Sequence, residues 1–272
     1  MGRGTWSWIV PDGLWELARP LIPPDRVRPQ GGGTANTPDE TLFAAIVYVL
    51  VSGCAWRALP PCFGVSKSTV HRRFLIWSRA GVWGRLHEAV LERLDDAGLL
   101  DVTRTVLDSA HVRAKKGEVF TGPSPVDRGK PGSKMHVLSD AAGLPLIVAV
   151  TAGSTHDSKA LKPMVEAYQM RQATWGERYR KPGRLHADKA YDVPHLRKWL
   201  RGKRIGVRIA RKGIESSERL GRRRWVIERT MSWLTGYRRL NHRYERDPRN
   251  YLAFLGLAAT LCCYKRLARI TT

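Results

Sequence analysis

The order of apolar segments in the second half of the chain constrains the fold more than any other feature. The first three segments, residues 104–112, 134–139 and 145–151, predict consecutive strands. Asp140-Ala-Ala-Gly143, between the last two, is typical of a hairpin turn. The later patterns alternate between helix and strand, at residues 158–170, 184–188, 193–201, 204–210, 217–235 and 249–267. This order predicts an α/β domain.

Three consecutive strands followed by alternating helices and strands are the plan of a ribonuclease-H-like core, the retroviral integrase superfamily. We assign it residues 101–272, with basic helices at its C-terminal end. Residues 1–100 predict a separate helical domain, because their apolar residues recur at helical spacing. We expect a first helix at residues 12–22, with Asp12 as its N-cap, followed by a linker rich in Gly and Pro at residues 27–38. Three further helices are expected at residues 37–52, 66–80 and 84–97.

The helix that begins at Ser66 combines an apolar stripe with a basic face. Val70, Phe74 and Trp77 recur at i, i+4 and i+7, and no acidic residue occurs from Gly64 to His87. A helical module that ends in a basic helix resembles a helix-turn-helix, whose second helix enters the major groove of DNA. The candidate DNA-binding residues are Lys67, His71, Arg72 and Arg73. The alternative interpretation is a solvated face of a structural helix.

Three acidic residues stand in distinctive contexts. Asp108 ends the apolar run in TVLDSAHV, Asp188 ends the one in RLHADKAYD, and Glu228 lies in the helical pattern RRRWVIERTMSWL. Carboxylates cost free energy to bring together unless a cation lies between them, so three of them in a basic protein predict a divalent metal site. Oxygen ligands of this kind suit two-metal phosphodiester chemistry.

Each acid also has a simpler interpretation. Asp108 and Asp188 are in places where a carboxylate often caps a turn, and Glu228 follows Arg224 by one helical turn, as in an ion pair. Asp192 competes with Asp188 as the second ligand. It precedes Val193-Pro194, however, where an N-cap aspartate is expected, so we favour Asp188. The histidines lack the spacing of a zinc site.

The chain has 47 Lys and Arg against 24 Asp and Glu, a formal net charge of +23 that predicts a polyanionic partner. Residues 1–100 hold 11 basic and 9 acidic residues, whereas residues 197–249 hold 18 and 5, so the partner is expected mainly against the C-terminal third. An anionic membrane is the competing partner, but no basic amphipathic helix dominates. The apolar stretch Tyr251–Tyr264 is shorter than a span of about 20 residues and predicts a buried helix. The N-terminus lacks an apolar signal core, so a cytoplasmic, nucleoid-associated protein is expected.

At these motifs the chain resembles the DDE transposases of bacterial insertion sequences, in the family named after insertion sequence five. The resemblance extends over nearly the whole chain. It is carried, in order, by SGCAWRALPPCFG, RRFLIWSRAGVW, LDSAHVRA, DRGKPGSKMHVLSDAAGLPL, THDS, ADKAYD and RRWVIERTMSWLTGYRRLNHRYER. It implies Asp108, Asp188 and Glu228 as catalytic metal ligands, two Mg²⁺ or Mn²⁺ ions, and action on terminal inverted repeats and target DNA by a homodimer or larger synaptic complex.

The last motif departs from the family. Related transposases often carry a tyrosine, an arginine, the glutamate and a lysine along this helix; here Arg224 and Glu228 match, but Gly221 and Thr235 occupy the other two positions. Arg238 and Arg239, about one turn later, are candidates for the missing contact, beside the basic run Arg222, Arg223 and Arg224. The alternative functions are a ribonuclease-H-like or resolvase-type nuclease and a helix-turn-helix regulator.

Overall fold

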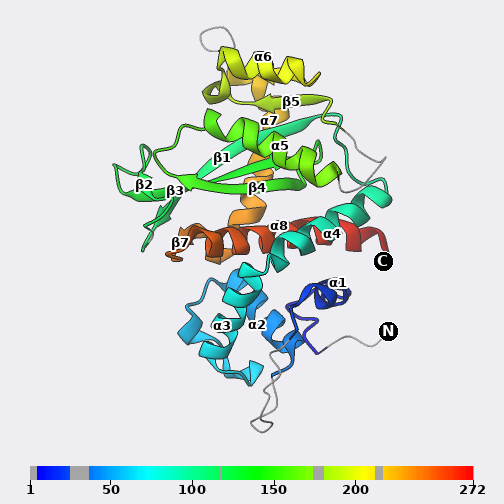
Figure 1. Ribbon diagram of the computed structural model, residues 1–272, viewed down its shortest axis with the longest axis vertical. Coiled ribbons are helices and arrows are strands. Elements are labelled where there is room, and N and C mark those ends of the chain that lie inside the picture. Colours follow the sequence, from blue (N-terminus) through cyan, green and yellow to red (C-terminus); the bar gives the residue numbers. More distant parts are fainter. Residues whose placement is uncertain (1–4, 25–36, 117, 174–180, 212–216, 272) are drawn as a thin grey trace.

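The computed structural model describes residues 5–24, 37–116, 118–173, 181–211 and 217–271, without the side chains of residues 172–173, 217–224 and 270–271. The predicted linker at 27–38 lies almost wholly outside the described residues. A sheet with its helices forms one end of the molecule, and the N-terminal helices form the other (Figure 1). The long last helix, α8, lies between them.

The sheet confirms the ribonuclease-H-like plan. Its main strands are ordered β4-β3-β1-β5-β6, with β3 antiparallel to its neighbours β1 and β4, and with β5 and β6 parallel to β1. The parallel strands require crossover connections, which the intervening helices provide. These strands are β1 Thr105–Ala114, β3 Pro131–Ser139, β4 Pro145–Ala152, β5 Arg184–Ala187 and β6 Gly206–Ile209. Two short strands that the sequence did not predict, β2 Gly122–Pro123 and β7 His242–Arg243, pair with β3 and β1.

The predicted hairpin between β3 and β4 is closed by a buried carboxylate. Asp140 is fully buried and accepts backbone N–H groups from Asp101, Ala142 and Leu144. Burial raises the pKa of this carboxyl to about 6, although the three N–H donors favour its ionised form. Gly143 adopts φ +88°, and a Cβ atom there would lie 2.8 Å from Oγ1 of Thr230. The glycine therefore allows the hairpin to pack against helix α7.

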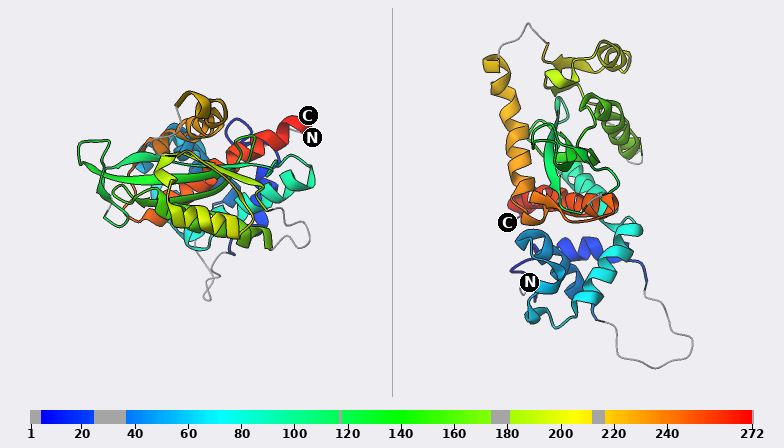
Figure 2. Two further views of the ribbon diagram at one scale, coloured as in Figure 1. Left: turned by 90° about the horizontal axis from the view of Figure 1, so that it is seen from above. Right: turned by 90° about the vertical axis from the view of Figure 1, so that its left-hand side faces the viewer.

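Helices cover both faces of the sheet. Helices α5 Ser158–Ala173 and α6 Pro194–Gly202 lie on one face, and α7 Ser217–Thr235 crosses the other (Figure 2). Thr230 fixes α7 to the hairpin, because its hydroxyl donates to the Gly143 carbonyl at 2.6 Å. The bounds of α7 are those predicted from the sequence.

Helix α8, Pro248–Thr271, packs against both β4 and α4. It is long and apolar enough to cross a membrane by length and composition, but 67% of the relevant window is buried inside the protein. Tyr251, Phe254 and Leu257 are fully buried. The prediction of a buried helix over 251–264 is therefore confirmed, and α8 is part of the core.

The N-terminal region contains α1 Leu14–Ala18, α2 Asp39–Ser52, α3 Lys67–Arg79 and α4 Val82–Asp96. The prediction of Asp12 as an N-cap is wrong. The cap residue is Gly13, which has φ +81° and makes no side-chain cap bond. A Cβ atom at Gly13 would lie 2.5 Å from the Tyr264 hydroxyl, and that hydroxyl donates to the Asp12 carbonyl at 2.6 Å. A contact with α8, rather than local capping, determines this helix start.

Helix α3 begins as predicted. Ser66 Oγ accepts the Thr69 N–H at 3.1 Å, and the stripe Val70, Phe74 and Trp77 is buried. Phe74 stacks on Phe254 of α8 with ring centroids 4.3 Å apart. One hydrophobic cluster runs through the N-terminal helices, α8 and the sheet. The division into domains at residue 100 stays a prediction.

Candidate active site

The register of β1 and β5 brings Asp108 and Asp188 to neighbouring positions. Leu107 pairs with Ala187 in this parallel ladder; Asp108 is the next residue of β1, and Asp188 directly follows the end of β5. Carboxyl ends of parallel strands are where open α/β sheets bind their ligands. Two residues that are 80 positions apart in the sequence thus become neighbours at the carboxyl end of β5, although β1 itself continues to Ala114.

Tyr191 lies close enough to Asp108 and Asp188 for its pKa to depend on their charge. Its ring is buried in the turn that follows β5. Desolvation raises the pKa of its hydroxyl well above the usual value, and the negative charges of Asp108, Asp157 and Asp188 raise it further. Three carboxylates therefore act on one hydroxyl, and a cation at this edge would relieve their mutual repulsion.

Asp157 is a site residue that sequence reasoning missed. Its Oδ1 accepts hydrogen bonds from Ser109 Oγ at 2.8 Å and from the buried Lys134 Nζ at 2.9 Å. Burial favours a raised pKa for this carboxyl, but the bonds from Lys134 and Ser109 outweigh it and lower the pKa. The block THDS contains this aspartate and was the available signal. Because Lys134 already neutralises it, Asp157 supports the site from behind.

Alternation along β1 places Asp108 on the face of α7. Ser109 contacts Asp157, which precedes α5, so Ser109 points to the α5 face and its neighbour Asp108 to the opposite one. Helix α7 lies on that opposite face (Figure 2). Glu228 is exposed on α7. The helix that carries the third predicted ligand thus covers the face of the sheet to which Asp108 points.

The donor set fits a divalent metal in part. Asp108 and Asp188 supply hard oxygen ligands at adjacent positions, as Mg²⁺ and Mn²⁺ prefer. Among the residues that the structure describes, no group of three His, Cys, Asp or Glu side chains is close enough to hold an ion. The structure therefore brings two of the three predicted ligands together and leaves Glu228 apart from them.

The two rival aspartates have different partners. The Asp188 carboxylate accepts the Ala190 N–H and caps the short 3₁₀ turn Lys189–Tyr191. Asp192 is bound by Arg197, whose Nε lies 2.6 Å from its Oδ1 and whose Nη2 also donates to the Ile209 carbonyl. This ion pair gives Asp192 a structural role that links α6 to β6.

The predicted DNA-binding residues fall into three groups. On α3, Lys67, His71 and Arg72 are exposed, and Arg73 is half-buried. The side chains of Arg222, Arg223 and Arg224 lie outside the described part of α7. Beyond α7, Arg238 is exposed.

Arg239 is a correction. Its side chain is 7% exposed, and its guanidinium donates through Nε and Nη2 to Glu245 Oε1 and through Nη1 to the Cys54 carbonyl. It also lies 5.4 Å from the Phe254 ring centre. These bonds leave no donor face for a phosphate, so the expected DNA contact does not hold for this residue. Arg239 instead ties the segment after α2 to the start of α8.

Comparison with known proteins identifies the class. Residues 101–263 match the family model described as "Transposase DDE domain", and residues 10–87 match the one described as "Putative transposase of IS4/5 family". The chain therefore belongs to the DDE transposases, which are metal-dependent DNA endonucleases and strand transferases.

Two curated relatives come from Burkholderia cepacia. The chain is 37% identical over 166 residues to "Putative transposase for insertion sequence element IS402", covering 61% of this chain and 77% of the relative. It is 36% identical over 119 residues to "Insertion element IS402 uncharacterized 16.2 kDa protein", covering 43% and 81%. Both alignments place the chain among the proteins of bacterial insertion sequences.

The likeness to solved structures is weak. A pre-cleavage Mos1 transpososome is 11% identical, with a TM-score of 0.30 over 89% of this chain and 82% of that one. The catalytic domain of Mos1 mariner transposase is 10% identical, with a TM-score of 0.29 over 66% and 89%. Scores this low carry no argument about the site, which rests on the sheet topology and the aspartates.

Proposed function

We propose that this transposase binds the terminal inverted repeats of an insertion sequence, cleaves phosphodiesters at their ends and joins the 3′ ends to target DNA. The observation that carries the proposal is the adjacency of Asp108, within β1, and Asp188, at the carboxyl end of β5. The net charge of +23 suits a DNA substrate. The protein would act in the cytoplasm, at the nucleoid.

Asp108, Asp188 and Glu228 would hold two Mg²⁺ or Mn²⁺ ions. When bound, such ions activate water and neutralise the charge on attacking and leaving oxygens of an in-line displacement. Glu228 would approach the aspartates only with metal and DNA present, because three unscreened carboxylates repel one another. The pair Asp157–Lys134 would support β1 beside Asp108, because Asp157 also accepts a hydrogen bond from Ser109.

DNA would contact the protein in two places. The exposed face of α3 (Lys67, His71 and Arg72) is suited to reading base edges in the inverted repeat, with Phe74 and Trp77 anchoring the helix. The arginines of α7 and the exposed Arg238 would bind phosphates beside the site. Because the two transposon ends are processed together, we expect a homodimer or a larger synaptic complex.

The test is a supercoiled plasmid that carries inverted repeats, incubated with the protein and Mg²⁺. We expect excision or insertion products, whereas hydrolysis of an RNA–DNA hybrid alone would indicate a ribonuclease H. Retention of the plasmid without cleavage would indicate a DNA-binding regulator.

Substitution of the acids tests the site itself. Asp108→Asn, Asp188→Asn and Glu228→Gln should each reduce cleavage by at least about a thousandfold, since each removes a metal ligand, while metal-free band shifts stay nearly unchanged. Asp192→Asn is the matched control, because that carboxylate is held by Arg197. Cleavage by Asp188→Asn together with an inactive Asp192→Asn would overturn the assignment of the second ligand.

A further inference from the structure

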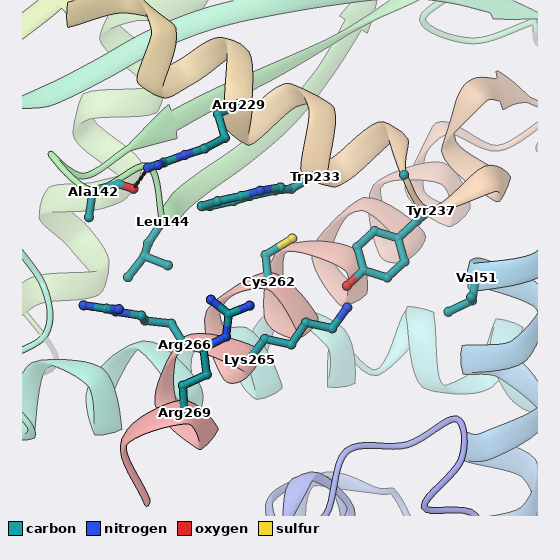
Figure 3. Close-up of a pocket in the computed structure, with 11 residues that line it drawn as sticks. Val51, Ala142, Leu144, Arg229, Trp233, Tyr237, Cys262, Lys265, Arg266 and Arg269 are labelled. Atoms are coloured by element: carbon teal, nitrogen blue, oxygen red, sulfur yellow. Dashed lines mark hydrogen bonds between the residues drawn. The ribbon is translucent and has the colours of Figure 1, made fainter. Parts of the chain in front are cut away.

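A cavity of about 660 Å³ opens between the second half of α7, the end of α8 and the turn that joins β3 to β4 (Figure 3). Trp233 forms one wall, and Lys265, Arg266 and Arg269 rise from α8 on the other side. This volume lies within the range of sites that hold a small molecule or a nucleotide. None of the catalytic acids lines it.

The cavity is strongly positive. Four cationic side chains line it and no carboxylate does, namely Arg229, Lys265, Arg266 and Arg269. Arg229 donates to the Ala142 carbonyl at 2.6 Å. The other three make no ion pair with a described residue, and two turns at the end of α8 hold them together. No carboxylate among the described residues of the lining offsets their field, so the cavity favours an anion.

Exposed aromatic rings adjoin these charges. Trp225 and Trp233 are 50% and 38% exposed, and the Arg229 guanidinium lies 4.5 Å and 4.7 Å from their ring centres. The three side chains follow one another at i, i+4 and i+8 along α7, and we call them the tryptophan ladder. Large apolar rings are normally buried, so a ladder that stays exposed beside a cationic cavity indicates a ligand with a flat face.

We propose that this cavity binds one unpaired nucleotide of a DNA strand, with its base against Trp233 and its phosphate against Lys265, Arg266 and Arg269. Stacking on an indole requires a base that has left the duplex, since paired bases hide their faces. An acidic peptide would use the cations but leave the part of Trp233 that lines the cavity uncovered. The inference rests on the proposed function, because the DNA strand in question is the one that would pass the proposed active site. Glu228, a proposed metal ligand, directly precedes Arg229 on α7.

The test compares three probes with the full chain in the absence of metal. The probes are a twelve-nucleotide thymidine strand, an abasic sugar-phosphate strand of equal length and a duplex of twelve base pairs. Wild type should bind the thymidine strand about tenfold tighter than the abasic strand, as one stacked base contributes. Trp233→Ala should remove this difference, and Trp233→Phe should retain most of it because a ring remains.

Charge reversal tests the phosphate side. Arg266→Glu should weaken binding of both single strands severalfold. The control is Arg93→Glu, an equal change of net charge at an exposed arginine of α4, which should weaken binding less. Equal effects of the two reversals would mean that net charge, and no cavity, governs binding.

Three results would overturn the proposal. They are equal wild-type affinity for the thymidine and abasic strands, an unchanged preference in Trp233→Ala, and tighter binding of the duplex than of the thymidine strand. Displacement of the thymidine strand by an equal concentration of a polyglutamate peptide would point to an acidic protein partner instead. Asp108→Asn separates this inference from the proposed function. If Asp108→Asn loses cleavage but still prefers the thymidine strand to the abasic strand, the result concerns the catalytic site alone. If the wild-type enzyme cleaves DNA but shows no such preference, only the proposal for the cavity is rejected.

Discussion

Two basic regions of this protein look alike in sequence and differ in structure. The face of α3 presents Lys67, His71 and Arg72 to solvent. The segment after α7 also carries several arginines, but Arg239 and Arg243 there are almost fully buried. Arg243 donates to carbonyls at Val119, Phe120 and Arg246 and to Ser133 Oγ.

The difference teaches that a basic residue is available to DNA only if the fold leaves its donors unused. On α3 the apolar stripe buries one side of the helix and leaves the charges on the other. After α7 the chain pairs with the end of β1 through β7, and several backbone carbonyls are buried there. The five N–H donors of an arginine guanidinium can satisfy such a set of carbonyls. Four predictions test this contrast, beginning with the largest effect.

Arg239→Ala should lower the free energy of unfolding by about 3–5 kcal/mol, because it leaves Glu245 buried without its partner. Arg238→Ala is the matched control, because the Arg238 side chain is next in sequence and exposed. It should change the free energy of unfolding by less than about 0.5 kcal/mol. Chemical denaturation followed by circular dichroism measures both. Equal losses would mean that Arg239 is no more structural than Arg238.

The buried side chain of His87 extends the contrast between buried and exposed basic groups to the pH dependence of stability. Burial, then the charge of Arg171, lowers the pKa of His87 from 6.5 to about 3. The unfolded chain therefore binds a proton that the folded chain rejects, and stability is lost as pH falls from 6.5 towards 3. Between pH 6.5 and 4.5 this group should remove about 2–3 kcal/mol.

The measurement is the free energy of unfolding against pH for wild type and His87→Gln. The variant should show a shallower fall in this interval, whatever its absolute stability. His195→Gln, at an exposed histidine of α6, should keep the wild-type slope. If His87→Gln also keeps it, other groups cause the acid sensitivity.

Arg72→Ala should reduce discrimination between an inverted-repeat duplex and a scrambled duplex about tenfold, because base contacts specify and phosphate contacts only position. Its unfolding free energy should change by less than about 0.5 kcal/mol, in contrast to Arg239→Ala. Band shifts at physiological salt measure the discrimination. Arg93→Ala, outside α3, is expected to leave it unchanged, and an equal loss in both variants would remove the recognition role of α3.

The smallest effect is on salt dependence. Arg238→Gln should reduce the slope of log K against log salt by about 0.9, the contribution of one phosphate contact. Arg239→Gln should leave this slope unchanged in the folded fraction, because its donors are occupied. A lower slope in Arg239→Gln would show that the buried guanidinium is released when DNA binds.

Much of the fold was predictable because its signals are local. Helical period and a serine cap are enough for α3, and an apolar stripe is enough for α7. That Asp108 and Asp188 each follow a short apolar run was also visible in the sequence, but their adjacency follows from the β1–β5 register. Asp157 could not be ranked beforehand, because its importance depends on Lys134 and Ser109 from two other strands.

The sequence by itself determined the main helices and strands, their order, the acidic residues available for metal and the excess of positive charge. Each of these depends on neighbours along the chain or on composition. Only the tertiary structure decided which charges remain available. It buried Arg239 with Glu245, engaged Asp192 with Arg197 and replaced the Asp12 side-chain cap by a hydrogen bond from Tyr264 to the Asp12 carbonyl. The physical reason is that burial and pairing energies arise between segments far apart in sequence, which no local pattern records.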